Sequence, residues 1–405
     1  MVAGCSQPAA PAFPKWAEDR STFAPATSSS NAFDGYVLAA RRAEELAVVP
    51  ASEGKKARDL AGKLTFTAAE KRSFIGRMAP AVREFRRASS LGCDYRFAAT
   101  PPTDSDPNAT GWRLIRNAII WQLEIDLGEG DYGPAVELAT MATKAGFDLA
   151  GGGAASADVG LQFADDARRL IAPHIPLLGS AQVARLTAGM KRALAAFPQF
   201  GAIAENEKQS FMTGIDWIQS QYRAGTFDEI DLYLGSSVRD ATTYLRQLKP
   251  DDREKRPAYF EGFAKEAEAY ADWYRSQSAL PVVKRQPPEK MALAKERPWR
   301  RYSASLFGTL PPILARYDAT LARTRLMILT GEVYRQIKLS QKAPKSLDGF
   351  SSELATDPYS GMKFRYEATG AEFRIYSVGP NFRDDQGATD SMYINPDLTL
   401  ETNPR

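Results

Sequence analysis

The chain contains few residues able to do metal or nucleophilic chemistry. It has one histidine, His174, between two prolines in APHIP, and two cysteines, Cys5 and Cys93. One histidine excludes two-histidine zinc sites and relays of several histidines, and two cysteines cannot build a disulfide framework or a thiolate metal site. We expect His174 to be a loop residue and Cys93 to be a small buried one. The sequence also lacks the G-x-S-x-G elbow, the P-loop and the dinucleotide fingerprint.

Paired carboxylates are the other source of catalysis that the sequence offers. Glu124 and Asp126 are two residues apart on a predicted helix, as are Glu205 and Glu207, so the members of each pair point in different directions. No acid pair can therefore be assigned from the sequence. A cell-wall or glycoside hydrolase that uses carboxylates from separate segments remains an alternative function.

An aromatic-rich segment, 259–274, is the remaining candidate for ligand contact. Core packing accounts for such a segment, and a carbohydrate or peptide groove is the alternative, because aromatic rings stack and carboxylates accept hydrogen bonds there. The aromatic residues are Tyr259, Phe260, Phe263, Tyr270, Trp273 and Tyr274, with Glu261, Glu266, Glu268 and Asp272 between them.

Charge argues against nucleic-acid binding, and hydropathy argues against a membrane-spanning helix. The 405 residues include 52 basic and 49 acidic side chains, and this net charge of +3 predicts no nucleic-acid partner. No apolar run approaches the roughly 18 residues of a membrane-spanning helix.

Residues 33–276 are predicted to form helix after helix. Thr67 and Glu70 have capping-box spacing, and an apolar stripe at helical spacing follows them. The segment GWRLIRNAIIWQLEIDLGEGDYGPAVELATMATKAG resembles a tetratricopeptide-type hairpin, with a Gly-rich turn and an Ala-rich second helix. We find no steady 34-residue period, so we predict an irregular array of antiparallel helical hairpins. Further helices are expected at 158–172, 181–197, 203–224, 236–248 and 257–276.

Residues 277–311 form a basic, Pro-rich stretch that we interpret as an exposed connector. Contact with anionic lipid headgroups or with an acidic partner is the alternative interpretation of its positive charge. From residue 312 to 405 we expect a long helix that ends before Pro344, followed by a small antiparallel sheet. Phe364 and Tyr366 alternate with polar residues, as do Phe373 and Ile375, and 367–371 is the expected hairpin connection.

Three motifs in the C-terminal segment carry a family resemblance. APKSLDGF, DPYSGMKFRY and FRIYSVGPNFRDDQG follow the long helix in this order. Together they resemble the C-terminal half of the major pseudopilin of bacterial type II secretion systems, over roughly 325–395. The chain as a whole resembles large helical lipoproteins of bacteria such as planctomycetes, which end in the same module. The resemblance implies a small α+β module, and participation in a secretion machine is a further alternative function.

The pseudopilin resemblance also implies a calcium site in the acidic loop. In that family the loop after the YS-x-G strand binds calcium in many members. Asn381, Asp384, Asp385 and Asp390 are the matching oxygen donors in this chain, and loop carbonyls would complete the shell of six to eight oxygens. An acidic surface loop whose Asp, Asn and Gly residues form turns is the alternative. No other cofactor is expected.

The N-terminal segment resembles the lipobox of bacterial lipoproteins. Val2-Ala3-Gly4-Cys5 has the small residues that such a peptidase site requires, and the resemblance implies that Cys5 carries the lipid. The Pro-, Ala- and Ser-rich residues that follow, up to residue 32, have the composition of a tether. A chance match of four small residues is the alternative.

These observations predict a scaffold or binding protein of the bacterial cell envelope that is not an enzyme. It would be lipid-anchored at Cys5, face the periplasm or the exterior, and bind a protein partner that the sequence does not identify.

Overall fold

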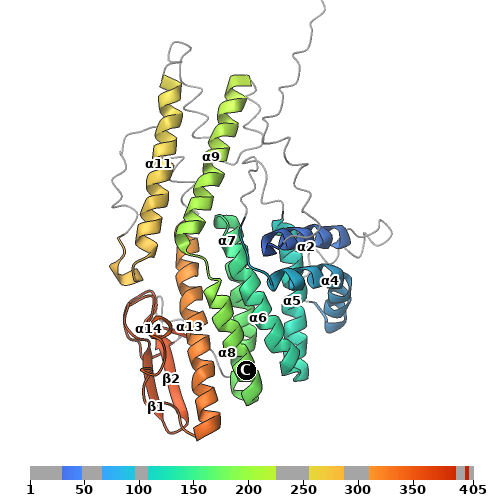
Figure 1. Ribbon diagram of the computed structural model, residues 1–405, viewed down its shortest axis with the longest axis vertical. Helices are drawn as coiled ribbons and strands as arrows, with labels where there is room; N and C mark the ends of the chain where they lie inside the picture. Colours follow the sequence, from blue (N-terminus) through green and yellow to red (C-terminus); the bar gives the residue numbers. More distant parts are fainter. Residues whose placement is uncertain are drawn as a thin grey trace, which may run out of the picture.

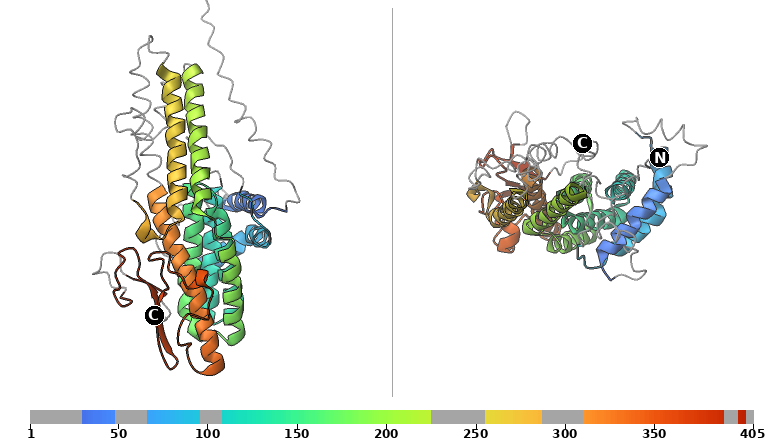
Figure 2. Two further views of the ribbon diagram at one scale, coloured as in Figure 1. Left: turned by 60° about the vertical axis from the view of Figure 1, so that its left-hand side comes forward. Right: turned by 90° about the horizontal axis from the view of Figure 1, so that it is seen from above.

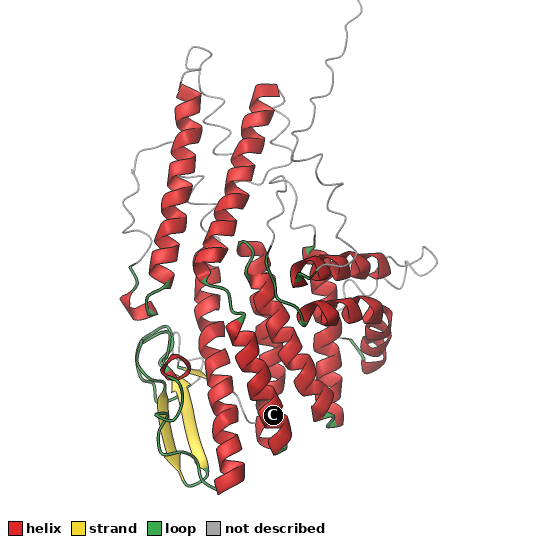
Figure 3. Ribbon diagram, in the orientation of Figure 1, coloured by secondary structure: helices red, strands yellow, loops and turns green. Residues whose placement is uncertain are grey.

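The computed structural model describes residues 30–47, 66–95, 108–224, 255–286, 310–388 and 397–400 (Figure 1). Cys5 and Asp390 lie outside these residues, as do the helix expected at 236–248 and most of the predicted tether and connector. The described part is mainly α-helical with a three-stranded antiparallel sheet near its C-terminal end (Figure 3), which confirms the predicted fold class.

The elements follow one another in this order. The longer helices are α2 (Ala32–Ala47), α4 (Ala68–Ser89), α5 (Ala109–Glu129), α6 (Tyr132–Ala150), α7 (Ala154–Ile171), α8 (Ser180–Ala195), α9 (Phe200–Ala224), α11 (Lys255–Ser278) and α13 (Leu310–Ser340). The short helices are η3 (Ala172–Leu177), η6 (Val282–Lys284) and α14 (Ser352–Ala355), and the strands are β1 (Arg365–Thr369), β2 (Glu372–Ser377) and β3 (Leu398–Thr399).

Local sequence signals account for several helix ends. The Thr67 hydroxyl accepts the Glu70 backbone N–H at 3.3 Å, and the Glu70 carboxylate accepts the Thr67 N–H at 2.7 Å, which confirms the predicted capping box. Gly130 ends α5 in the left-handed conformation, with φ +75°, and this lets the chain reverse into α6. The predicted stripe of α5 is buried, and consists of Trp112, Ile115, Ile119, Leu123 and Leu127.

Small residues allow a close helix crossing between α6 and α7. A Cβ atom built on Gly160 would overlap the carbonyl oxygen of Gly146 and lie 2.6 Å from the Ala150 nitrogen. The two backbones therefore touch directly, as expected where glycines face each other.

The helices pack in sequence across the body of the molecule. Helices α2, α4 and α5 contact one another at one side, α6 packs on α7 and α8, and α13 packs on α7 and α8. Helices α9 and α11 run side by side and extend beyond the others (Figures 1 and 2). None of the helices in the described ranges combines the length and apolar character that crossing a membrane requires.

The sheet lies against α13, on the side of the molecule opposite α2 and α4 (Figure 2). β2 pairs with β1 on one edge and with β3 on the other, and Thr369 lies opposite Glu372. The hairpin connection is therefore only Gly370 and Ala371, shorter than the predicted 367–371, with Gly370 at φ +66°. Leu326 and Leu329 of α13 share a continuous core with the side chains of α2, α4 and α5.

Candidate functional site

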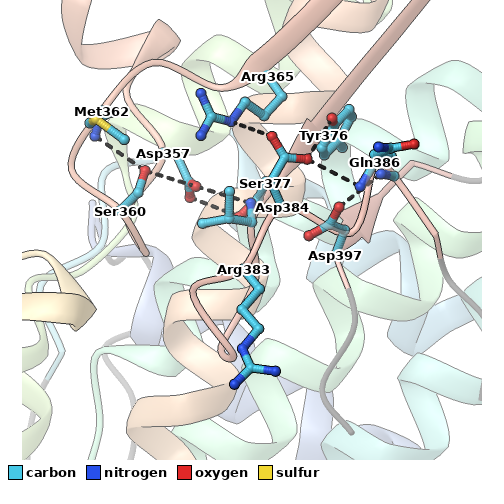
Figure 4. Close-up of polar contacts among 12 residues, drawn as sticks. Asp357, Ser360, Met362, Arg365, Tyr376, Ser377, Arg383, Asp384, Gln386 and Asp397 are labelled. Atoms are coloured by element: carbon cyan, nitrogen blue, oxygen red, sulfur yellow. Dashed lines mark hydrogen bonds and ion pairs between the residues drawn. The ribbon is translucent and has the colours of Figure 1, made fainter. Parts of the chain in front are cut away.

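The acidic loop follows β2 and folds back onto side chains of β1 and β2 (Figure 4). Its backbone takes the left-handed conformation at Gly379, Phe382, Gln386 and Gly387. Asp and Asn side chains in such loops accept backbone N–H groups two residues onward. Asn381 does so for Arg383 N–H at 2.9 Å, so part of its polarity serves the turn.

Asp384 fastens the loop to the two long strands. Its Oδ1 accepts the Tyr376 hydroxyl at 2.9 Å and the Gln386 N–H at 3.1 Å, and its Oδ2 pairs with the Arg365 guanidinium at 3.0 Å (Figure 4). Burial, followed by the hydrogen bond to Asp384, raises the pKa of Tyr376 to about 12. Both oxygens of Asp384 are thus engaged by groups of the protein.

Asp385 lies close to Asn381, another of the predicted calcium ligands. The Asn381 amide donates a hydrogen bond to Asp385 Oδ2 at 2.7 Å. The structure therefore brings Asn381, Asp384 and Asp385 into one loop, and the fourth predicted donor, Asp390, lies outside the described residues.

Asp397 is an acidic residue of this loop region that the sequence analysis did not identify. It is 2% exposed, and its Oδ2 accepts the Gly387 N–H at 2.8 Å. Its Oδ1 is buried without a hydrogen-bond partner. Burial raises the pKa of Asp397 and the Gly387 N–H lowers it; the charges of Asp385 and Asp384 raise it further, and the backbone of Asp385 lowers it. Nothing in NPDLTL marks this residue, because its closeness to the loop comes from the pairing of β3 with β2.

A calcium ion fits this loop in part. The buried Asp397 Oδ1 is the kind of oxygen that a hard cation would satisfy, and Asp385 is its acidic neighbour. Asp384 fits less well, because Arg365 and Tyr376 already hold it. In the described part of the chain, no group of three acidic, cysteine or histidine side chains is close enough to form a metal site.

A second carboxylate, Asp357, joins the DP turn to the end of β2. It is 1% exposed; Oδ1 accepts the Tyr359 N–H at 3.0 Å and the Ser377 hydroxyl at 2.8 Å. Oδ2 accepts the Ser360 hydroxyl at 3.2 Å and the Val378 N–H at 3.3 Å (Figure 4). Two of the motifs quoted for the pseudopilin resemblance therefore meet at one side chain.

A strap of residues 280–286 covers the DP turn. Val282 N–H donates to the Pro358 carbonyl and Val283 N–H to the Tyr359 carbonyl, both at 3.0 Å. Arg285 anchors the strap through a double hydrogen bond to Asp318 of α13, at 2.5 and 2.8 Å, and the side chains are 11% and 4% exposed. The strap is therefore tied to the protein by its backbone and by Arg285, whereas residues 279, 280, 283, 284 and 286 are exposed.

A groove lies at the opposite side of the molecule, between α4, α5 and the start of α6. Its volume is about 340 Å³. The apolar part of its lining is formed by Ile75, Ala79, Val82, Ala118, Ile119, Pro134 and Leu138. The polar part is formed by Arg83 and Arg86 of α4, Gln122 and Asp126 of α5, and Asp131, which precedes α6.

The basic residues of this groove lie on α4, and its acidic residues lie on α5 and just before α6. Asp126 is 7% exposed and accepts the Gln122 amide at 2.6 Å. Burial raises the pKa of Asp126 and the Gln122 hydrogen bond lowers it; the charges of Asp131 and Glu129 raise it again, and the charge of Arg86 lowers it. Within the described ranges, the side chains of Arg83, Arg86 and Asp131 form no hydrogen bond or ion pair. Asp126 was considered from the sequence as half of an acid pair. The groove could not be predicted, because three separate segments form it.

The remaining chemical candidates are His174, Cys93 and Glu124. His174 lies in the 3-10 helix η3, not in the expected loop, beside the ring of Tyr132; within the described ranges its Nδ1 is buried without a hydrogen-bond partner, and burial lowers its pKa. Cys93 is half-buried near the Asp148 carbonyl, and burial raises the pKa of its thiol to about 12. Glu124 pairs with Lys71 at 2.7 Å.

The second proposed acid pair is separated by its contacts. Glu205 pairs with Lys208 and Arg275, and Glu207 accepts the Ala154 N–H at 2.8 Å. In the aromatic segment, Tyr274 is 1% exposed and packs in a core with Phe200. The side chains of Tyr259, Phe260 and Phe263 lie outside the described residues.

Comparison with known proteins gives no relative. No family model matches the chain, and no curated sequence or solved structure matches it either. The pseudopilin and lipoprotein resemblances therefore stay predictions that the motifs alone support.

Proposed function

We propose that this chain is a binding protein of the bacterial cell envelope, held at the membrane by a lipid on Cys5 and acting without catalysis. The observation that carries the binding role is the groove between α4, α5 and α6, where two arginines and two aspartates surround an apolar lining. Small-molecule sites combine a largely apolar wall with a few convergent polar groups in this way. The packed helices around the groove supply a rigid frame.

Lipid attachment is tested by metabolic labelling. The gene with its native upstream sequence is expressed in a bacterium fed an alkyne fatty acid, and the label on the purified chain is measured. We expect label on the wild-type protein and on Cys93→Ser, and none on Cys5→Ser. Equal label on both variants, or no label on the wild type, would remove the anchor from the proposal.

Calcium would have a structural role in the acidic loop. Asp385 and the buried Asp397 would hold the ion and draw the loop towards β3. Calcium at 100 times its dissociation constant would stabilise the fold by about 2.7 kcal/mol. We expect the full chain to melt at a higher temperature in calcium than in a chelator, and Asp397→Asn to lose this difference while the exposed Asp348→Asn keeps it. An identical melting temperature in both conditions argues against a bound ion.

Hydrolysis of a cell-wall or glycan substrate is the second candidate function. It is favoured by the pair Asp126 and Asp131 in the groove, because a buried acid with a raised pKa beside a second carboxylate resembles an acid–base pair. Release of reducing sugar from purified peptidoglycan by the wild type, with loss in Asp126→Asn, would support it. No release by the wild type removes this candidate. A role beside a secretion machine remains a prediction of the C-terminal motifs.

A further inference from the structure

We propose that the groove between α4, α5 and α6 binds a small zwitterion, namely an amino acid or dipeptide with free termini and aliphatic side chains. This inference rests on the proposed binding function and names its ligand class. It needs neither the lipid anchor nor the calcium loop, so it is tested separately from both.

The groove's size limits the ligand to a small molecule. Sites for small ligands range from about 300 to 1,000 Å³, and the volume of about 340 Å³ lies near the lower limit. A folded protein segment would not be enclosed by it. The apolar lining, which includes the side chains of Ile75, Val82 and Leu138, would receive an aliphatic group.

The cationic wall is suited to a carboxylate. Arg83 and Arg86 are three residues apart on α4, so they lie on neighbouring positions of one helix face. Their side chains form no ion pair within the described ranges, and both residues are exposed at the groove. Guanidinium groups bind a carboxylate through paired, charge-assisted hydrogen bonds.

The acidic wall is suited to an ammonium group. Asp126 and Asp131 come from α5 and from the residue before α6, whereas both arginines come from α4. Burial outweighs the opposing charge of Arg86 and disfavours the charged form of Asp126, so a ligand cation would stabilise a carboxylate that the free protein holds at a cost. A ligand that carries only one of the two charges would leave one wall without a partner.

Isothermal titration of the full chain with leucyl-leucine tests the proposal. We expect a dissociation constant on the order of 0.1–1 mM, ordinary for a ligand of this size. Three blocked forms are titrated in parallel: N-acetyl-leucyl-leucine, leucyl-leucine amide, and the peptide blocked at both ends. Each blocked end should weaken binding roughly tenfold, because it removes one charge-assisted contact.

Two variants assign the two ends of the ligand. Arg83→Gln should weaken leucyl-leucine and its N-acetyl form roughly tenfold but leave the amide unchanged. Asp131→Asn should weaken leucyl-leucine and its amide but leave the N-acetyl form unchanged. Arg87→Gln, on the same helix but outside the groove lining, is the matched control and should bind as the wild type does. Circular dichroism confirms that each variant is folded.

The outcomes separate this inference from the proposed function. No heat with leucyl-leucine up to about 10 mM, or equal affinity for the doubly blocked peptide, would overturn the zwitterion site. Equal effects of Arg83→Gln and Arg87→Gln would overturn it as well. None of these results bears on whether Cys5 carries a lipid. A failure of lipid labelling, in turn, would not change the result of the titration.

Discussion

Replacing Asp357 by asparagine isolates the contact that joins the DP turn to the end of β2. The carboxylate accepts four hydrogen bonds, two of them from the backbone N–H groups of Tyr359 and Val378. Asparagine keeps the shape of the side chain but converts one acceptor oxygen into an NH₂ donor. Serine hydroxyls can rotate to accept from that donor, whereas a backbone N–H cannot.

The magnitude of the effect follows from the contact geometry. Each carboxylate oxygen accepts one backbone N–H, so either orientation of the amide leaves one buried N–H facing a donor. An unsatisfied buried group costs about 1–3 kcal/mol, and loss of charge assistance in the remaining bonds adds about 1 kcal/mol. We therefore expect Asp357→Asn to destabilise the C-terminal segment by roughly 2–4 kcal/mol.

Hydrogen–deuterium exchange reports this loss locally. The peptides that contain the amides of Tyr359 and Val378 should exchange roughly 30- to 1,000-fold faster in Asp357→Asn than in the wild type. Ser360→Ala is the matched control, because it removes only the Ser360 bonds to Asp357 Oδ2 and from the Met362 N–H, both 3.2 Å, and leaves three acceptor contacts of Asp357 in place. Its effect should stay below about 1 kcal/mol, or less than sixfold in exchange rate.

The reasoning fails if the two variants behave alike. Exchange in Asp357→Asn within about threefold of the wild type would mean that the carboxylate contributes little to the junction, so that the apolar contacts of the sheet with α13 hold the segment. Faster exchange throughout the helices would instead mean that the contacts of Asp357 are lost only when the whole protein unfolds.

Three further perturbations test the packing, the charge pairing and the thiol. Gly160→Ala should destabilise the protein by about 1–3 kcal/mol in urea denaturation, because the new Cβ meets the α6 backbone. Gly76→Ala has open space around it and should stabilise the protein by about 0.5–1 kcal/mol. A change of the same sign in the free energy of unfolding of both variants would refute the close crossing. Burial raises the pKa of Glu332, but hydrogen bonds from Lys191 and Arg335 lower it more, so the net pKa is depressed. The stability advantage of the wild type over Glu332→Gln should therefore be full above pH of about 4.3 and fall as the pH drops below it, and a constant difference between pH 7 and 3 would contradict the pairing. At pH 8 the Cys93 thiol, measured in Cys5→Ser, should react with a disulfide reagent roughly a thousandfold more slowly than in urea, and comparable rates would show that the thiol is not perturbed.

Short-range signals in the sequence were sufficient for the helices. The capping box at Thr67 and Glu70, the apolar stripe that begins at Trp112 and the turn at Gly130 are each encoded within a few residues. These signals rest on hydrogen-bond geometry and on helical periodicity, which neighbouring residues fix largely by themselves.

The same local reasoning misjudged features that depend on distant neighbours. The positive charge of residues 277–311 gave no sign that Arg285 pairs with Asp318 on α13, 33 residues away. Buried carboxylates of this kind need a partner, and composition does not show where the partner lies. The hairpin connection was predicted too long because strand ends depend on pairing as well as on alternation.

By itself the sequence determined a mainly helical chain with a small sheet after its last long helix, because caps, stripes and turn residues act over a few positions. The tertiary structure alone decided which carboxylates lie together: Asp397 beside Asp385, and Asp126 with Asp131 at the groove. The physical reason is that side-chain burial and charge proximity depend on the packing of whole elements. Helices α4, α5 and α6 must be stacked before the groove exists.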